Sequence, residues 1–207
     1  GVTTGTPNPV GGTFDNINNL IGDSSGTLTG PDDPNVWIID GSNSGMLNDV
    51  SFSGVANLVG GSETDSFTFE LFGVLTGSID GGGGVSDTLT GDDDGNIFTV
   101  TDSDEGTLDG KTSGFVQIEN LTGGSGADSF TVFSTAGVSL SGNLVGGDGS
   151  DTVDIQLGGS VGGDVTGGLQ DDSLTIDGSV GGDVTGGDGD DLIDIEGTIA
   201  GDVDGGA

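Results

Sequence analysis

The sequence of 207 residues has no cysteine, no histidine and no tyrosine, and Lys111 is its only basic residue. Without cysteine there is no disulfide framework. Without imidazole, thiol or phenol groups, the chain lacks the usual catalytic acids, bases and nucleophiles. A hydrolase with two carboxylates is chemically possible, but no feature singles out one pair among the 35 acidic residues. We therefore expect that the protein is not an enzyme and has no small-molecule substrate.

The shortage of basic residues leaves a formal net charge of −34. Such a chain repels phosphate backbones and anionic lipid surfaces, and it has no basic patch to neutralise them. No stretch approaches the roughly 18 apolar residues that a membrane-spanning helix requires. We therefore expect neither nucleic-acid binding nor insertion into a membrane.

Glycine and aspartate dominate what is present, with 47 glycines and an acid excess made mostly of Asp. Low hydrophobicity with high net charge is typical of disorder. Two features oppose disorder here. Asp favours turns and is an oxygen ligand for hard cations, and the apolar residues recur in register. One alternative stays open, in which the chain is unfolded until a cation neutralises it.

Internal repeats run through the chain. Residues 160–168 return as residues 179–187 and, less closely, as residues 198–206, so this segment recurs at a constant spacing. In the middle of the chain, residues 52–61 return as residues 115–124, which is a longer spacing. The longer spacing equals about three turns of a coil with roughly 20 residues per turn. One pitch therefore fits the whole chain.

Within each repeat the pattern is typical of strands. Val153 and Ile155 alternate with polar residues, as do Phe67 and Phe69, between Gly-Gly pairs and Asp. Period-2 alternation bounded by turn residues predicts short half-buried strands, and glycine is too dense for helices. The predicted fold class is therefore all-β, a parallel β-solenoid (β-roll or β-helix) with rungs, that is repeat units, of about 19–23 residues.

We expect one domain over residues 1–207. Residues 1–145 carry the longer, Phe-rich repeats. The regular rungs, of about 19–21 residues each, lie in residues 146–207. Phe98 and Phe130 recur at equivalent places, and Trp37 takes the place of Phe98 in the long repeat. These rings are predicted to stack in the core.

One nine-residue pattern, G-G-x-G-x-D-x-U-x with U apolar, recurs in the turns. The segments that fit it at every fixed position are residues 123–131, 146–154 and 186–194. Partial matches begin at Gly60, Gly82 and Gly167 and have Glu63, Val85 and Gln170 at the fourth position. The pattern resembles the calcium-binding nonapeptide of repeats-in-toxin (RTX) proteins, a parallel β-roll of large secreted bacterial proteins. The chain is also similar, more loosely, to the degenerate repeats of large bacterial surface proteins and adhesins.

The pattern has a direct physical reason. Glycines let the backbone turn sharply and direct carbonyl oxygens inward, and the Asp at the sixth position places a carboxylate beside them. Because stacked rungs lie about 4.8 Å apart, an ion between two loops takes oxygens from both. Ca²⁺ binds six to eight oxygens in flexible geometry, which suits such a site better than Mg²⁺. The alternative is that these Asp residues only form Asx-turns.

The resemblance implies Ca²⁺ as the cofactor and an extracellular or cell-surface location in bacteria. In this register four Asp residues form the ligand column, and further Asp residues of the same loops add charge. The residues of the predicted calcium sites are Gly123, Gly126, Asp128, Gly147, Asp148, Gly149, Asp151, Asp171, Asp172, Gly187, Asp188, Gly189, Asp190 and Asp191.

A rung of this chain carries one such loop, whereas in the family the nonapeptide usually repeats back to back. We therefore expect one column of family-type calcium sites. A second column, Asp164, Asp183 and Asp202, aligns at the other edge of the rungs. It is interpreted as a weaker cation site, with a hydrated acidic face as the alternative.

These inferences predict an extracellular, calcium-stabilised structural protein. Its partners are expected to be copies of itself, stacked head to tail into a filament or surface layer through the open strand edges of a solenoid. Two alternatives stay open: a stalk segment of a large bacterial adhesin, and an RTX-type secretion module of an exported protein. Filaments made by this chain alone favour the first, and soluble monomers favour the other two.

Overall fold

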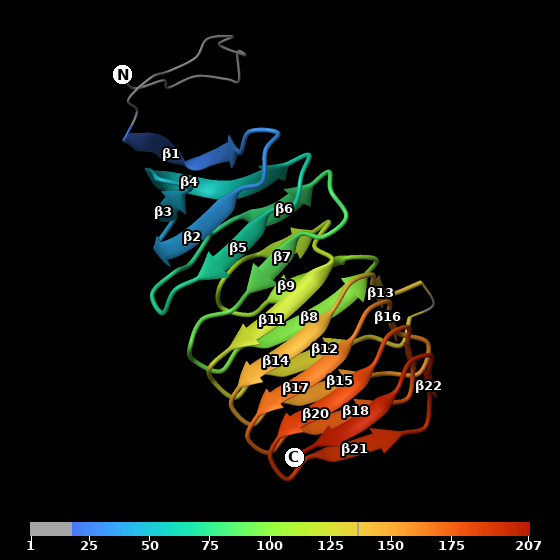
Figure 1. Cartoon of the computed structure of the whole chain (residues 1–207). Coiled ribbons are helices and arrows are strands. Elements are labelled where there is room, and N and C mark those ends of the chain that lie inside the picture. The colour runs from blue at the N-terminus through green and yellow to red at the C-terminus, as the bar shows by residue number, and fades with distance from the viewer. Residues whose placement is uncertain (1–17, 136) are drawn as a thin grey trace.

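The computed structural model describes residues 18–135 and 137–207, so residues 1–17 and 136 of the predicted domain lie outside it. Within these ranges the protein is all-β, as predicted, and no helix is long and apolar enough to cross a membrane. Nineteen strands form one large, mostly parallel sheet, and four short strands form a second sheet. Figure 1 shows the strands stacked along one direction, from β1 at one end of the molecule to β21 at the other.

Eleven strands precede the most regular part of the chain. They are β1 (Asn19–Thr29), β2 (Val36–Gly41), β3 (Ser44–Leu47), β4 (Val50–Gly61), β5 (Ser66–Phe69), β6 (Ser78–Gly82), β7 (Thr88–Thr90), β8 (Ile97–Asp102), β9 (Glu105–Leu108), β10 (Gly114–Val116) and β11 (Asn120–Gly124). Strand β2 pairs in parallel with β5, β5 with β7, and β7 with β11. Parallel pairing therefore already begins in this half of the chain.

Two antiparallel excursions interrupt the parallel pairing, which the sequence did not predict. Strand β3 pairs antiparallel with both β2 and β4, and β9 pairs antiparallel with both β8 and β10. Trp37 lies opposite Leu47 in the first excursion, and Phe98 lies opposite Leu108 in the second. The long repeat thus encodes one extra antiparallel strand in each copy, which lengthens the Phe-rich repeats.

The remaining strands follow a regular order. They are β12 (Ser129–Val132), β13 (Ser139–Leu140), β14 (Leu144–Asp148), β15 (Thr152–Ile155), β16 (Ser160–Val161), β17 (Val165–Leu169), β18 (Ser173–Ile176), β19 (Ser179–Val180), β20 (Val184–Asp188), β21 (Leu192–Ile195), β22 (Thr198–Ile199) and β23 (Val203–Gly206). Each rung here contributes three strands, and each strand pairs in parallel with its counterpart in the next rung.

The register between these rungs follows the sequence repeat. Ser129 pairs with Thr152, Thr152 with Ser173, and Ser173 with Leu192. The last of these steps has the same spacing as the repeat of residues 160–168 in residues 179–187, and the two earlier steps are slightly longer. This register is compatible with the predicted coil.

Each rung of this region has one corner more than the sequence indicates. The sequence pattern marks only two edges per rung, the nonapeptide loop and the shorter Gly-Gly-Asp turn. Three strands make three corners, and the third corner is formed by residues 156–159, 177–178 and 196–197.

The core lies between the strands and is built from stacked side chains. The rings of Phe98 and Phe130 stack with centroids 4.8 Å apart, and those of Trp37 and Phe67 stack at 5.6 Å. All four are fully buried, as predicted. A buried side chain of this size contributes about 1.5–3 kcal/mol to folding, so a thin core built from few apolar residues still holds the rungs together.

Glycine is required where two rungs approach most closely. In three successive regular rungs, the second glycine of the Gly-Gly pair that opens the nonapeptide loop has a positive φ, 117° at Gly147, 136° at Gly168 and 125° at Gly187. A Cβ on Gly168 would lie 1.8 Å from the carbonyl oxygen of Gly147 in the preceding rung. Both the backbone conformation and the space therefore exclude a side chain.

Replacing Gly168 with Ala is predicted to lower the free energy of unfolding by at least about 2 kcal/mol, because the new methyl group clashes with a backbone oxygen. Gly205 is the matched control, since a Cβ there meets nothing within 4 Å. Urea unfolding followed by circular dichroism measures both variants. Equal stabilities of Gly168→Ala and Gly205→Ala would contradict the close stacking described here.

Candidate metal centre

Eight loops that lead into core strands share one geometry. Each begins with a glycine and ends, five or six residues later, with an Asn or Asp that we call the loop-end residue. The loops are residues 30–35, 60–65, 81–87, 91–96, 123–128, 146–151, 167–172 and 186–191. The first glycine is needed because its inner side, where a Cβ would point, is occupied by the side chain of the loop-end residue. A Cβ on Gly146, for example, would lie 2.3 Å from Asp151 Oδ2.

The loop-end residues of neighbouring rungs are connected by hydrogen bonds. The backbone N–H of Asp128 donates to Asp151 Oδ1 (2.7 Å), that of Asp151 to Asp172 Oδ1 (2.8 Å), and that of Asp172 to Asp191 Oδ1 (2.9 Å). Asn96 begins this ladder by donating its N–H to Asp128 Oδ1 at 2.6 Å. The predicted ligand column of four Asp residues is therefore brought together in register.

A second ladder of the same kind lies earlier in the chain. The N–H of Asn35 donates to Asp65 Oδ1 (2.7 Å), and the N–H of Asp65 donates to Asp87 Oδ1 (2.7 Å). The N–H of Asp87 donates to Glu119 Oε2, also at 2.7 Å. Asp65 and Asp87 are not among the site residues predicted from the sequence, although they stand at the sixth position of the partial matches that begin at Gly60 and Gly82.

The other carboxylate oxygen of each Asp in the two ladders is buried and has no hydrogen-bond partner among the residues that the structure describes. These six atoms are Oδ2 of Asp65, Asp87, Asp128, Asp151, Asp172 and Asp191. A buried polar atom without a partner is costly. Six of them in equivalent places are a feature of the repeat rather than an accident of one loop, and each could accept a proton donor or a cation.

Two loops end in Asn, and these loops have a hydrogen-bond donor, the amide nitrogen Nδ2, in the place of Oδ2. Asn96 Nδ2 lies beside its first glycine, as Oδ2 does in the Asp loops. It donates to the carbonyl oxygens of Asp92 (2.8 Å) and Asp94 (2.6 Å) and to Asp128 Oδ1 (3.0 Å). An amide donor thus joins two loop carbonyls to the carboxylate of the next rung.

Asn35 makes the same bonds in its own loop. Its Nδ2 donates to the carbonyl oxygens of Pro31 (3.0 Å) and Asp33 (2.7 Å) and to Asp65 Oδ1 (2.7 Å). In the Asp loops a carboxylate oxygen stands where these loops have a donor. For Asp151, the carbonyl groups at the corresponding loop positions belong to Gly147 and Gly149. Oxygen facing oxygen is repulsive unless a proton or a cation lies between them.

The loop that ends in Asn96 also contains a cation supplied by the chain itself. Lys111, the only basic residue of the sequence, forms an ion pair with the buried carboxylate of Asp92. The Lys111 ammonium group also donates to the carbonyl oxygen of Leu71 at 3.4 Å. The buried Asp92 of this loop is therefore neutralised by the chain itself, whereas no basic residue remains for the Asp loops.

Burial changes the protonation of the two ladders. The pKa of Asp87 and of Asp151 is raised to about 6, mainly by desolvation and in addition by neighbouring carboxylates, against the lowering effect of the backbone hydrogen bond. Desolvation also raises the pKa of Asp65, Asp128 and Asp172. The charged form of these side chains is therefore disfavoured as long as no cation is bound.

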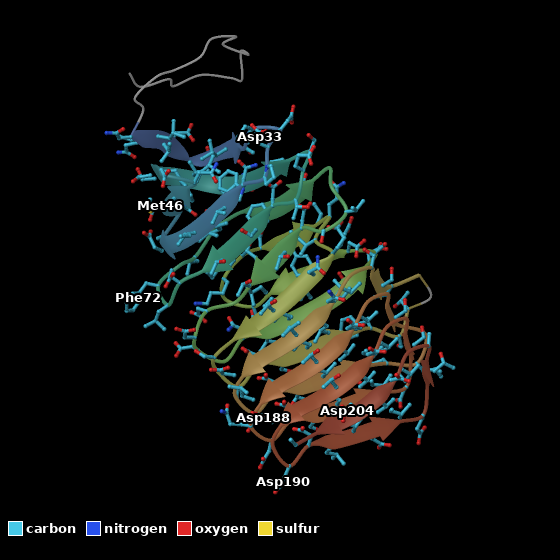
Figure 2. All side chains as sticks on the ribbon, viewed as in Figure 1. Asp33, Met46, Phe72, Asp188, Asp190 and Asp204 are labelled. Atoms are coloured by element: carbon cyan, nitrogen blue, oxygen red, sulfur yellow. The ribbon has the colours of Figure 1, made fainter. Side chains whose placement is uncertain are left out.

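The other predicted site residues lie elsewhere in the same loops. Gly147, Gly149, Gly187 and Gly189 have positive φ, as the motif requires, and Gln170 adopts a φ of 72° at the fourth position. Gly123 is a first glycine, and a Cβ on Gly126 would meet the backbone of Asp94. The side chains that do not join the ladder are exposed; they are Asp148, Asp171, Asp188 and Asp190. Figure 2 shows Asp188 and Asp190 on the outside of the loops near the C-terminal end of the stack.

The second predicted column is aligned but exposed. The N–H of Asp183 donates to Asp164 Oδ1 (2.8 Å), and that of Asp202 donates to Asp183 Oδ1 (2.7 Å). None of these residues has a buried oxygen without a partner in the described ranges. The geometry therefore favours the loop-end ladders over this column as cation sites.

Within residues 18–135 and 137–207, no three acidic, histidine or cysteine side chains converge on one point as a metal-binding group. A cation at a loop-end residue would take its carboxylate and, for the rest, backbone carbonyl oxygens. This is a donor set that Ca²⁺ accepts, because Ca²⁺ binds carbonyl and carboxylate oxygens in flexible geometry.

Comparison of the chain with protein-family models, with curated proteins and with solved structures finds no match. The geometry described above therefore carries the functional argument alone.

In the presence of a chelator, the protein is predicted to be most stable in acid. The pKa of Asp87 and Asp151 is raised from 3.8 to about 6 in the folded state, so the folded state binds protons more tightly than the unfolded state. This stabilisation is complete below about pH 4 and is lost as the pH rises through 6. Thermal unfolding between pH 4 and 8 measures it.

Net negative charge also destabilises the fold as pH rises, so the control must remove the same charge elsewhere. Asp87→Asn/Asp151→Asn is expected to flatten the pH profile more than Asp109→Asn/Asp194→Asn, in which both positions are exposed. Identical profiles for the two double variants would show that the buried carboxyl groups do not control the pH dependence.

Proposed function

We propose that this chain is a parallel β-solenoid that acts as an extracellular structural protein stabilised by Ca²⁺, and that its copies stack head to tail into a filament or surface layer. The observation that carries the proposal is the repeated, buried and unpartnered Oδ2 atom at the loop-end Asp residues. The ions would be held by Asp128, Asp151, Asp172 and Asp191, each with the carbonyl groups of its own and the neighbouring loop.

The comparison between Asn and Asp loops supports a cation rather than a rearranged hydrogen bond. Asn96 satisfies its loop with an amide donor, and Lys111 neutralises the nearby Asp92. The Asp loops lack both, while the chain carries a net charge of −34. A divalent ion would meet both needs, since it binds the facing oxygens and offsets the charge. One buried loop-end carboxylate per loop suits the affinities of about 10⁻⁴–10⁻³ M found in extracellular calcium modules.

The variant Asp151→Asn tests this assignment, because it gives the loop the amide that Asn96 has. In chelator at pH 7.5 we expect it to raise the free energy of unfolding by about 1–3 kcal/mol, since an unpartnered oxygen is replaced by a donor. In calcium it should bind fewer ions than the wild type, as measured by equilibrium dialysis.

Asp194→Asn is the matched control, since Asp194 is exposed and lies in the strand that follows the last of these loops. It removes the same charge and should leave the number of ions unchanged. If Asp151→Asn and Asp194→Asn bind as many ions as the wild type, Asp151 is not a calcium ligand.

Head-to-tail stacking is supported by the strands of the last described rung. Strands β21, β22 and β23 each pair on one side only, with β18, β19 and β20. Ile195 is 36 % exposed and Val203 is 50 % exposed, although their counterparts in the preceding rung, Ile176 and Val184, are fully buried. An edge of this kind is a template for further strand pairing. A second copy would fill it, and so would a further rung of an adhesin stalk.

Sedimentation velocity separates these possibilities. In chelator we expect slowly sedimenting species, because the negative charge keeps copies apart. In millimolar CaCl₂ we expect large species that disappear when chelator is added again. A monomer of unchanged size in CaCl₂ would rule out self-assembly by this chain and favour the stalk segment or the secretion module.

A further inference from the structure

We propose a further calcium column at Asp65 and Asp87, in loops that do not carry the complete nonapeptide motif. The inference rests on the proposed function and extends it, since it assigns the same ion to a ladder that the sequence pattern leaves out. Its basis is two fully buried carboxylates whose Oδ2 atoms lack partners within the described part of the chain.

Asp65 has the geometry of the motif loops although Glu63 stands at the fourth position. Both side chains of the pair are 0 % exposed. A Cβ on Gly60 would lie 2.2 Å from Asp65 Oδ2 and 2.2 Å from the carbonyl oxygen of Gly81. The carboxylate oxygen and the carbonyl oxygen of the next rung thus face the same small space, as Asp151 Oδ2 and the Gly167 carbonyl do over Gly146.

Asp87 repeats this arrangement one rung later. A Cβ on Gly81 would lie 2.7 Å from Asp87 Oδ2 and 1.9 Å from the carbonyl oxygen of Gln117. Glu119 adds a further carboxylate, since its Oε2 accepts the N–H of Asp87 at 2.7 Å. Asp65 and Asp80 also interact electrostatically with Asp87. Glu119, Asp65 and Asp80 therefore add negative charge near Asp87, and the chain's only basic side chain is paired with Asp92.

The ladder of this column begins at Asn35, as the other ladder begins at Asn96. Its amide donates to two carbonyl groups of its own loop and to Asp65 Oδ1. Each ladder thus begins at an Asn that satisfies its own loop and continues through Asp residues that do not. The ions of this column would lie beside Asp65, between loops 60–65 and 81–87, and beside Asp87, next to Glu119.

The chain contains a local reporter for this column. Trp37 is the only tryptophan, and its ring stacks on Phe67 at 5.6 Å. Phe67 follows Asp65 by two residues, and Asn35 precedes Trp37 by two residues. Trp37 therefore reports ion binding at Asp65, whereas the motif loops of the other ladder lie in later rungs.

The test compares the full-length wild type with Asp65→Asn/Asp87→Asn and with Asp151→Asn/Asp172→Asn. CaCl₂ is titrated while bound ions are counted by equilibrium dialysis and Trp37 fluorescence is recorded. Asp65→Asn/Asp87→Asn should bind about two ions fewer and lose the fluorescence change. Asp151→Asn/Asp172→Asn should also bind fewer ions but keep the fluorescence change.

The outcomes distinguish this inference from the proposed function. If only Asp151→Asn/Asp172→Asn reduces the number of ions, the column at Asp65 and Asp87 is wrong, and the column from Asp128 to Asp191 is retained. If the wild type binds no Ca²⁺, both are wrong.

A measurement on the wild type covers the case in which the double variant does not fold. Terbium titrated in place of Ca²⁺ should give emission sensitised by Trp37, and excess CaCl₂ should remove it. Terbium binding without sensitised emission would overturn the assignment to Asp65.

Discussion

In-register stacking of parallel strands is the constraint on which this structure depends. It places each residue about 4.8 Å from its counterpart in the next rung, so every interaction is repeated along the stack. Apolar residues gain from this repetition, as the stacked rings of Phe98 and Phe130 show. Glycines such as Gly168 allow it, because the preceding backbone leaves no room for a side chain. Stacking is unfavourable for the buried carboxylates, because it brings groups of like charge together in a place without water.

The loop-end residue is either Asn or Asp, and the two side chains differ only in whether a nitrogen or an oxygen lies beside the first glycine. Where the loop-end residue is Asn35 or Asn96, an amide nitrogen donates to the loop carbonyls. Where it is Asp, an oxygen occupies the same place and has no partner in the described ranges. The proposed ion would make the Asp loops equivalent to the Asn loops. Folding would then depend on the concentration of that ion in the surroundings.

Much of this arrangement follows from the sequence, because a repeat fixes what is stacked on what. The constant spacing of the C-terminal repeats predicts the pairing of Ser173 with Leu192, and the motif predicts the column from Asp128 to Asp191. The positive φ of Gln170 shows that the loop keeps its backbone even where the fourth glycine is replaced.

The sequence does not predict the rest, for physical reasons that can be named. The third corner at residues 177–178 has too few residues to form a pattern of its own, and the hairpins through β3 and β9 look like further parallel strands because they have the same alternation. The exposure of Asp148 and Asp188 depends on loop backbone geometry. Asp65 and Asp87 were missed because their partial matches lie outside the run of neighbouring loops from Gly123 to Asp191, within which Asp172 was predicted despite its own partial match. The site depends on the first glycine and the loop-end carboxylate rather than on the fourth position.

The central claim is that the buried Oδ2 atoms are cation ligands, and a crystal structure grown in CaCl₂ tests it most directly through anomalous difference density. The account predicts peaks about 2.3–2.6 Å from Oδ2 of loop-end Asp residues such as Asp87 and Asp151, and none beside the amides of Asn35 and Asn96. Density only at exposed residues such as Asp188, or no calcium at all with the buried ladders intact, would contradict it.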